Sequence, residues 1–279
     1  MADGVASGDP LTQRSARVVA AVKLQRHTGR RRSGRFLVEG PNLVAAAGTR
    51  GLVDEVFATA EAAGRHHDLL SRLPVAVPVS VVTEAAAKAL SETVTPSGLV
   101  AVCHTPAVDL AEVLAGRPAL VAVAVELSEP GNAGTLIRVA DAMGAAAVVF
   151  AGHGVDPYNG KCLRSSAGSI FALPVLSDPD VAGVLDRLRA AGLQVLATAL
   201  DGELSLDDAD PVLAGPTAWL FGSEAHGLSA AVSAAADRRI TIPMTGGAES
   251  LNVATAAAIC LYQTARAQRR QEKQAQTRA

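Results

Sequence analysis

The chain has 279 residues and a mass of 28.3 kDa, with 49% hydrophobic residues, 3% aromatic residues and a formal net charge of −2. Its apolar content excludes a disordered chain, and 25 glycines and 14 prolines are too few for a collagen-like repeat. The near-neutral net charge, taken alone, argues against a nucleic-acid partner.

The basic residues, however, gather at the two ends of the chain. Residues 1–35 hold eight basic and two acidic side chains, a net charge of +6, and residues 264–279 carry +4, which leaves −12 for residues 36–263. Basic blocks at chain ends either bind nucleic acid or form solvated, frayed termini, and charge alone does not decide between them. The sequence contains no membrane-length apolar run, and its first residues lack the apolar region of a signal peptide, so we expect no signal peptide and a cytoplasmic protein.

Short apolar runs alternate with alanine-rich helical patterns along the first hundred residues. We expect strands at Phe36–Val38, Val53–Ala58, Val77–Val82 and Leu99–Cys103. A helix is expected over Thr83–Thr93, with Thr83 as its N-cap. The following stretch, His104–Pro118, contains two prolines and indicates a linker with one short helix.

A second alternating series follows the linker. We expect strands at Leu120–Val125, Ala146–Phe150, Leu193–Ala199, Ala218–Phe221 and Ile240–Ile242. Continuous apolar runs such as LVAVAV are typical of parallel strands covered by helices on both faces, so the fold class is α/β. The stretch from Ser250 to about Gln271 has no glycine or proline and predicts one long final helix, whose basic last turns suit the negative end of the helix dipole.

The cysteine and histidine residues show no metal-ligand spacing. Cys103, Cys162 and Cys260 are widely separated, and the six histidines form neither an HExxH motif nor a cluster with cysteine. We therefore expect buried thiols in a reducing compartment, and no metal site.

Three polar segments stand at the ends of apolar strands. The first, EPGNAGTLIR, opens a helix near Asn132, which could cap it, and carries Arg138 on an otherwise apolar helix. The second, FGSEAHGLS, places Gly222 and Glu224 directly after a strand, where open α/β sheets bind ligands. In the third, IPMTGGAESLNV, Ser250 begins the final helix with free backbone N–H groups.

Each segment alone also has an ordinary structural explanation. Arg138 could be a solvated surface residue, the FGSE segment a tight turn, and Ser250 a simple N-cap. Neither a GxxxxGK[ST] loop nor a GxGxxG fingerprint is present. The individual segments therefore do not decide the function.

Together, and in this order, the segments resemble the motifs N-x-G-x-x-x-R, F-G-S-E-x-x-G-L-S and I-P-M-x-G-x-x-x-S-L-N-V of the SpoU (TrmH) family of RNA 2′-O-ribose methyltransferases. The resemblance covers about Leu120 to Gln268, and SSAGSIFALP at Ser165–Pro174 is also similar to that family. It implies a trefoil-knotted, parallel-sheet α/β domain of the SPOUT class, S-adenosylmethionine as methyl donor, and a homodimer formed through the knotted domain. Glu129 stands where aspartate is commoner, and Ala254 where the family often has serine.

The resemblance also implies roles for individual residues. The positions around the target ribose and the methyl group are Asn132, Arg138, Glu224, Ser250 and Asn252. The resemblance makes Arg138 the group that activates the 2′-hydroxyl. On physical grounds we expect Arg138 to bridge the RNA phosphate and the hydroxyl and to stabilise the developing alkoxide, with Glu224 orienting the hydroxyl or accepting its proton. The donor pocket would contain Thr198, Ala199, Gly222, Ile242, Met244 and Leu251, with Gly222 letting the adenosine approach the strand end.

The N-terminal stretch RHTGRRRSGRFLVEGPNLV resembles the smaller L30e-like α/β domain that precedes the knot in ribosomal-RNA members. Its candidate RNA-binding residues are Lys23, Arg26, Arg30, Arg31, Arg32 and Arg35. The low aromatic content favours recognition of RNA shape over base stacking. We expect a disordered arm at 1–14, an L30e-like substrate-binding domain at 15–104, a linker at 105–118, a methyltransferase domain at 119–270 and a basic tail at 271–279.

The motifs indicate the type of reaction more closely than they indicate the RNA substrate. The appended N-terminal domain favours 23S ribosomal RNA, with a transfer-RNA 2′-O-methyltransferase as the alternative. A non-catalytic RNA-binding ribosome-assembly factor on the same fold, and a base methylase or small-molecule enzyme on a related knot, are further alternatives. The complete set of polar positions argues against the non-catalytic factor, and the pair Asn132 and Arg138 of the first motif favours ribose methylation over the base methylase or small-molecule enzyme.

Overall fold

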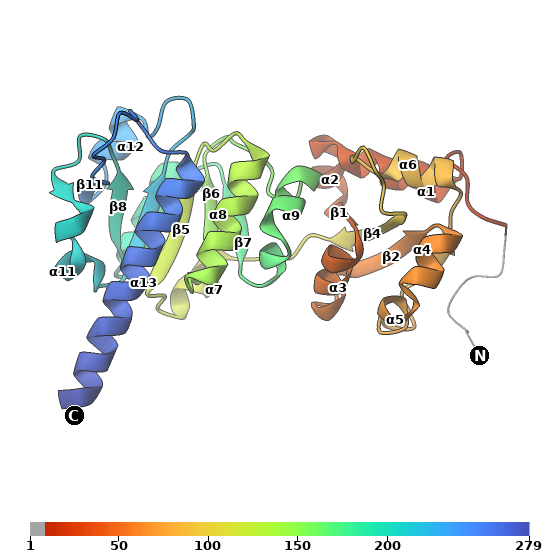
Figure 1. Ribbon diagram of the computed structural model, residues 1–279, viewed down its shortest axis with the longest axis horizontal. Coiled ribbons are helices and arrows are strands. Elements are labelled where there is room, and N and C mark those ends of the chain that lie inside the picture. The colour runs from red at the N-terminus through yellow and green to blue at the C-terminus, as the bar shows by residue number, and fades with distance from the viewer. Residues whose placement is uncertain (1–8, 279) are drawn as a thin grey trace. The chain divides into compact units, whose positions relative to one another are not determined.

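The computed structural model describes residues 9–278, which form two compact units (Figure 1). One unit contains the described residues up to Ala107 together with Tyr158–Phe171, and the other contains Val108–Pro157 and the chain from Ala172 onward. The expected disordered arm falls mostly on residues 1–8, which lie outside the described residues. Its end is held in place, because the Leu11 N–H donates a hydrogen bond to the Val81 carbonyl at 2.8 Å.

The first unit is built on a mixed four-stranded sheet with strand order β1-β4-β2-β3, in which β4 is antiparallel to both neighbours and β3 is parallel to β2. The strands are β1 (Arg35–Glu39), β2 (Val53–Ala58), β3 (Val79–Val81) and β4 (Leu99–His104). The helices are α1 (Ala16–Val22), η1 (Lys23–Gln25), α2 (His27–Ser33), α3 (Pro41–Thr49), α4 (Ala60–Arg65), α5 (His67–Leu70), α6 (Glu84–Leu90), α9 (Gly160–Ser166) and η2 (Ser169–Phe171). All four predicted strands of this region are confirmed.

Side-chain alternation along the strands forms the core of this unit. Val100 and Val102 of β4 point to the same face and pack with Phe57 of β2 against α1 and α6. Thr83 caps α6 as predicted, since its hydroxyl accepts a hydrogen bond from the Ala86 N–H at 3.2 Å.

The second unit contains a seven-stranded parallel sheet with strand order β7-β6-β5-β10-β8-β11-β9. The strands are β5 (Leu120–Val125), β6 (Val148–Ala151), β7 (Val175–Asp178), β8 (Gln194–Thr198), β9 (Leu204–Ser205), β10 (Thr217–Phe221) and β11 (Arg238–Thr241). The helices are α7 (Leu110–Ala115), α8 (Pro130–Ala142), α10 (Val181–Ala190), η3 (Leu206–Asp208), α11 (Asp210–Leu213), α12 (Ala230–Ala234) and α13 (Val253–Arg278). The α/β class with a parallel sheet and a smaller N-terminal domain is therefore confirmed, whereas β7 and β9 were not predicted.

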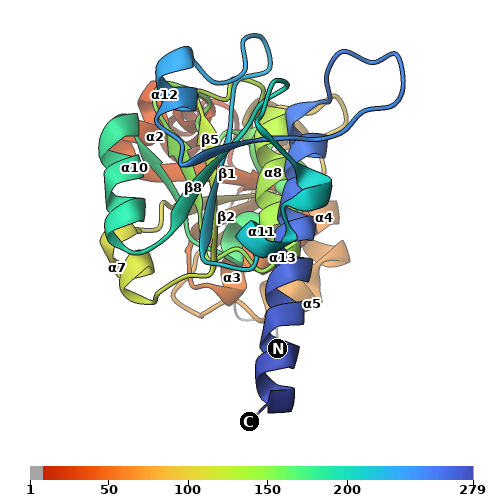
Figure 2. The same cartoon turned by 90° about the vertical axis from the view of Figure 1, so that its left-hand side faces the viewer.

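Helices cover both faces of this sheet, as the continuous apolar strands indicate. All six residues of β5 are buried. Side chains of α7, α10 and α12 pack on one face with Val121, Val123 and Val125. Helices α8 and α13 contact each other and the strands from the opposite side (Figure 2). Both faces of the sheet are thus covered by helices, so a ligand can reach the sheet only at the ends of its strands.

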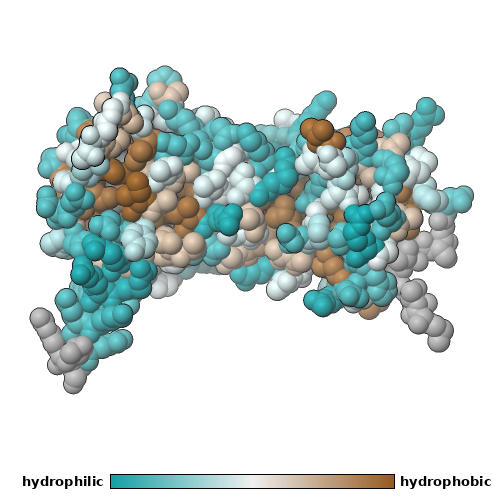
Figure 3. All heavy atoms as spheres, in the orientation of Figure 1, coloured by the Kyte–Doolittle hydropathy of each residue, from teal (hydrophilic) through white to brown (hydrophobic). Residues whose placement is uncertain are grey.

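Helix α13 begins three residues later than predicted. Its N-cap is Asn252, whose side-chain oxygen accepts hydrogen bonds from the Ala254 and Thr255 N–H groups at 2.9 and 3.3 Å, so Ser250 lies outside the helix. The helix continues to Arg278, and the predicted basic tail is therefore helical through that residue. Residues 271–276 of the helix are exposed, and hydrophilic side chains cover this projecting part (Figure 3).

A buried polar contact fixes α13 to the sheet. The Trp219 indole N–H donates to the Thr264 hydroxyl at 2.8 Å, that hydroxyl donates to the Cys260 carbonyl, and all three residues are fully buried. We expect Thr264→Val to lower the free energy of unfolding by about 1–3 kcal/mol, because valine keeps the shape but leaves the indole N–H without an acceptor. Urea unfolding followed by the fluorescence of Trp219, the single tryptophan of the chain, measures this loss.

Thr264→Ser is the matched control for that variant. Serine keeps the hydroxyl and removes one methyl group, so its loss should be near 0.8 kcal/mol. A Thr264→Val protein as stable as the wild type would show that this contact does not hold the helix.

Candidate active site

The predicted site residues lie at the carboxyl edge of the seven-stranded sheet. Strands β5, β10, β8 and β11 are consecutive parallel neighbours, so their carboxyl ends meet along one edge. Asn132 comes after β5, Gly222 and Glu224 after β10, Thr198 at the end of β8, and Ile242 after β11. Segments far apart in the sequence therefore converge where α/β sheets bind their ligands.

The Glu224 carboxylate is the centre of a hydrogen-bond network. One oxygen accepts from the Glu129 N–H and the Asn132 side-chain amide, both at 3.0 Å. The other accepts from the N–H and the hydroxyl of Ser128, at 3.2 and 3.0 Å. The side-chain oxygen Oδ1 of Asn132 in turn accepts a hydrogen bond from the side-chain amide of Asn252 at 2.9 Å. The network therefore joins all three sequence motifs.

The start of α8 differs from the sequence prediction. Asn132 was expected to cap this helix, but the cap is Glu129, whose carboxylate accepts a hydrogen bond from the Asn132 N–H at 2.7 Å. The reason is Pro130, which takes the first helical position and makes the preceding residue the N-cap. The Asn132 side chain is thereby free to bridge Glu224 and Asn252.

Two opposing effects set the ionisation of Glu224. Burial by itself raises the pKa of this carboxyl, but the hydrogen bonds from the Asn132 amide and from the backbone outweigh burial and hold the pKa below its usual value. Glu224 is therefore ionised at neutral pH and acts as a hydrogen-bond acceptor. A general base works best with a pKa near the operating pH, so the geometry favours the orienting role over proton acceptance.

Arg138 and Ser250 lie outside this network. Arg138 is exposed on α8, six residues and about 9 Å along the helix axis beyond Asn132. Its guanidinium makes no hydrogen bond or ion pair within residues 9–278. The exposed Ser250 hydroxyl, in the segment between β11 and α13, likewise makes no hydrogen bond to a described residue. Both side chains are available to a bound molecule.

The structure explains why residue 222 is a glycine, and the sequence did not indicate this reason. A Cβ at this position would lie 2.2 Å from the Gly227 carbonyl carbon and 2.3 Å from the Leu228 nitrogen. The space that a side chain would need at Gly222 is therefore filled by the residue's own turn, which explains the glycine without a ligand. Its expected contact with the methyl donor stays a prediction. A donor molecule could approach this residue only through backbone groups.

The other predicted donor-pocket residues lie half-buried along the same edge. Thr198 donates a hydrogen bond to a β10 carbonyl, and the Ala199 N–H donates to a β11 carbonyl, so both strand ends are fixed. Ile242, Met244 and Leu251 are partly exposed apolar residues in the segments that flank the loop before α13. Apolar side chains beside free polar backbone are typical of small-molecule sites.

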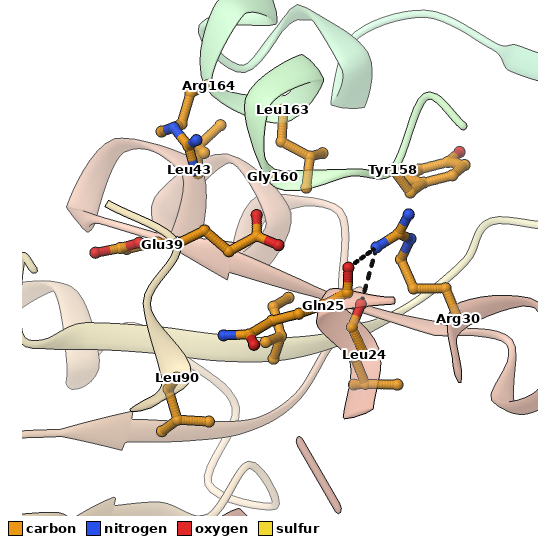
Figure 4. Close-up of a pocket in the computed structure, with 12 residues that line it drawn as sticks. Leu24, Gln25, Arg30, Glu39, Leu43, Leu90, Tyr158, Gly160, Leu163 and Arg164 are labelled. Carbon is orange, nitrogen blue, oxygen red and sulfur yellow. Dashed lines mark hydrogen bonds between the residues drawn. The ribbon is translucent and has the colours of Figure 1, made fainter. Parts of the chain in front are cut away.

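The predicted RNA-binding residues divide into two groups. Five of them form an exposed set that we call the basic face, and these are Lys23, Arg26, Arg31, Arg32 and Arg35. Arg30 is only 7% exposed, and its guanidinium donates to the Leu24 and Gln25 carbonyls at 3.0 and 2.8 Å (Figure 4). Arg30 therefore stabilises the turn between η1 and α2. This structural role differs from the phosphate contact that we expected for it.

Sequence reasoning missed Ser128, which supplies two of the four hydrogen bonds to Glu224. Its position between a buried strand and the E-P-G turn was the available signal. In the described part of the chain, no group of three or more histidine, cysteine or acidic residues is placed to bind a metal. No helix of residues 9–278 is long and apolar enough to cross a membrane. All three cysteines are buried, and burial raises the pKa of the Cys103 and Cys260 thiols.

Comparison with known proteins matches both parts of the chain. Residues 119–262 match the SpoU rRNA methylase family, and residues 16–101 match the MRM3-like substrate binding domain.

The chain is 37% identical over 241 residues to the 23S rRNA (guanosine(2553)-2′-O)-methyltransferase RlmP of Bacillus subtilis, and the match covers 86% of this chain and 92% of that protein. It is 39% identical over 174 residues to the 23S rRNA (uridine(2479)-2′-O)-methyltransferase of Streptomyces viridochromogenes, 61% of each chain. The crystal structure of the SpoU methyltransferase AviRb from Streptomyces viridochromogenes, in complex with AdoMet, is similar with a TM-score of 0.82 and 33% identity, covering 91% of this chain and 98% of that one.

Proposed function

The chain belongs to the SpoU rRNA methylase family, and from this membership we propose that it transfers a methyl group from S-adenosylmethionine to a ribose 2′-hydroxyl of 23S ribosomal RNA. The observation that carries the proposal is the network of Glu224, Asn132 and Asn252, which joins the three motifs at one sheet edge. The match of residues 16–101 to a substrate-binding domain supports a large folded RNA as substrate.

The residues at the sheet edge fit the proposed methyl donor. Ile242, Met244 and Leu251 offer partly exposed apolar surface for an adenine ring, beside the fixed ends of β8 and β10. The bound donor supplies a methyl group on a positively charged sulfur. The protein's own task is then to place a ribose hydroxyl in line with that group, and such positioning can supply several kcal/mol of the barrier.

The proposed chemistry divides between two side chains. Arg138, exposed and without a partner among the described residues, contacts the RNA phosphate and stabilises the alkoxide that develops on the 2′-oxygen. Its guanidinium has donors only and no lone pair to accept a proton, so the 2′-hydroxyl proton leaves to solvent water as the oxygen–methyl bond forms. Glu224 orients Asn132, so that motif one keeps its position relative to Asn252 of motif three.

Family membership also supports three further proposals. We propose that the methylase region forms the trefoil knot of the SPOUT class, and that the chain is a homodimer through this region. We also propose that the chain acts in the cytoplasm, where it would meet its ribosomal RNA substrate. We also keep the division at residues 15–104, 105–118 and 119–270, which the match at residues 16–101 supports for its first part.

A methyl-transfer assay tests the substrate class. Tritium-labelled S-adenosylmethionine is incubated with the protein and with unmodified transcripts of 23S rRNA, 16S rRNA or transfer RNA. The proposal predicts labelling of the 23S transcript alone. Labelling of transfer RNA would support the alternative substrate, and binding of the donor without any transfer would indicate a non-catalytic factor.

The basic face makes a prediction about RNA affinity. We expect Arg31→Ala combined with Arg32→Ala to weaken RNA binding, and to reduce the slope of log K against log salt by about 0.7–0.9 for each phosphate that is no longer neutralised. Filter binding of the 23S transcript at several salt concentrations measures the slope. Arg30 stays unchanged in this variant because its replacement would disturb the fold.

The matched control combines Arg65→Ala with Arg72→Ala, which removes the same charge from two exposed arginines of the same unit. Its salt slope should stay at the wild-type value. Equal slopes for both double variants would exclude the basic face as the phosphate-binding surface.

A further inference from the structure

Glu126 combines three features: it lies at the sheet edge beside the active site, its backbone is strained, and its side chain is exposed. It is the first residue after β5, where its N–H donates to the Ala151 carbonyl of β6 at 2.9 Å. It therefore lies on the carboxyl edge of the sheet, two residues before Ser128, which binds Glu224. No sequence motif had singled it out, and its side chain is exposed.

The backbone of Glu126 adopts a conformation that glycine would adopt more easily. Its φ angle is +52°, and only two other non-glycine residues of the described chain, Arg117 and Ala167, have positive φ. A residue with a Cβ adopts this conformation only at an energetic cost, and such strain gathers at functional sites. A glutamate kept here at that cost implies a use for its side chain.

The neighbouring strand end leaves room for this side chain. Gly152, which follows β6 and has a φ of +81°, lies so close that a Cβ on it would be 2.8 Å from the Glu126 Cγ and 3.4 Å from one carboxylate oxygen. Within residues 9–278 the Glu126 carboxylate makes no hydrogen bond or ion pair. Two neighbouring strand ends thus present an unpaired carboxylate beside the active site.

A carboxylate at an RNA site repels phosphates, so it binds hydrogen-bond donors, and of the RNA groups only the base edges distinguish one nucleotide from another. Two carboxylate oxygens accept two hydrogen bonds and donate none. Guanine presents two adjacent donors, N1–H and the N2 amino group, on its Watson–Crick edge, whereas cytosine offers one amino group and uracil one N–H between acceptors. We propose, on the basis of the proposed function, that Glu126 determines specificity by binding the guanine base of the nucleotide whose ribose is methylated.

The test begins with mass-spectrometric mapping of the methylated nucleotide in 23S rRNA treated with the wild-type protein. The inference requires a guanosine, and methylation of any other nucleotide would overturn it while leaving the proposed function intact. RNA fragments spanning the mapped position are then prepared with guanosine or with inosine, which lacks the N2 amino group, at that nucleotide. No methylation of any RNA would instead contradict the proposed function itself.

Glu126→Gly and Glu126→Gln are compared with the wild type on both fragments. For the guanosine fragment, we expect each variant to lower kcat/KM by about 10-fold to 100-fold. Inosine should lower the wild-type kcat/KM substantially and that of Glu126→Gly little, because the variant has no carboxylate to bind the N2 amino group. Equal sensitivity to inosine in both proteins, or an undiminished rate in Glu126→Gly, would overturn the inference.

Arg117→Gly is the matched control, since it relieves the same kind of backbone strain, at φ +49°, on an exposed residue of the same unit. It should leave kcat/KM unchanged on both fragments. Calorimetric binding of S-adenosylmethionine should be the same for all of these proteins, which shows that a lower rate does not come from a damaged fold.

Discussion

Replacing Arg138 by alanine is expected to lower methyl transfer to 23S rRNA by at least 100-fold to 1,000-fold, the range typical for loss of one group that stabilises a developing oxyanion. The fold should be unaffected, because the side chain is exposed and has no partner among the described residues. Single-turnover transfer of a labelled methyl group measures the chemical step, and calorimetry with S-adenosylmethionine and thermal unfolding show whether the rest of the site is intact.

Arg138→Lys is the control that separates charge from geometry. Lysine keeps the positive charge but not the planar fork that contacts a phosphate and a hydroxyl at once, so we expect an intermediate rate. If Arg138→Ala folds normally, binds the donor and methylates as fast as the wild type, the role given to this residue is wrong.

The second large effect is expected for Glu224→Gln. The carboxylate accepts four hydrogen bonds from Ser128, Glu129 and Asn132, whereas a glutamine oxygen can face only one side and its amino group would meet N–H donors on the other. We expect methyl transfer to fall by about 100-fold and the free energy of unfolding to fall by about 1–2 kcal/mol. Single-turnover transfer of a labelled methyl group measures the loss of activity, and thermal unfolding measures the loss of stability.

The pH dependence of this stability difference has a definite sign. Because the pKa of Glu224 is lowered in the folded protein, its contribution is fully present above the unfolded-state pKa of about 4.3 and is lost as the pH falls through the folded-state value. The difference between wild type and Glu224→Gln should therefore be constant from pH 6 to 8 and shrink below about pH 4. A difference that instead grows on acidification would contradict the account.

Asn132→Asp tests the same network from its other side. The substitution places a second carboxylate 3.0 Å from Glu224 in place of an amide donor, and the repulsion should raise the pKa of the pair. Asn132→Ala removes the donor without adding charge and is the matched comparison. A smaller loss of activity in Asn132→Asp than in Asn132→Ala would show that the amide is not a donor to Glu224.

Much of the fold follows from apolar patterning. Strands such as β5 are buried throughout, so their sequence is continuously apolar and their ends are sharp. The strands that were missed lack this signal, since β7 (VLSD) carries polar residues and lies at the edge of the sheet, and β9 has only two residues. Edge and very short strands are stabilised by their neighbours more than by their own composition.

The residues of the site could be predicted from the sequence, but the hydrogen bonds between them could not. The motifs identify Asn132, Glu224 and Asn252, whereas their mutual hydrogen bonds depend on how three strand ends meet. The charge of residues 14–35 marked a basic face, but a run of arginines does not indicate which of them turns inward, as Arg30 does. The cap of α8 could have been assigned correctly, because proline at the first helical position identifies Glu129.

The central claim, ribose methylation of 23S rRNA, is tested most directly by identifying the methylated atom. Unmodified 23S transcript is incubated with the protein and S-adenosylmethionine, digested to nucleosides and analysed by mass spectrometry, with the Arg138→Ala protein in parallel. The account predicts a single nucleoside with the methyl group on its ribose 2′-oxygen, strongly reduced in the variant. A methyl group on a base, or no methylation while the donor binds normally, would contradict it.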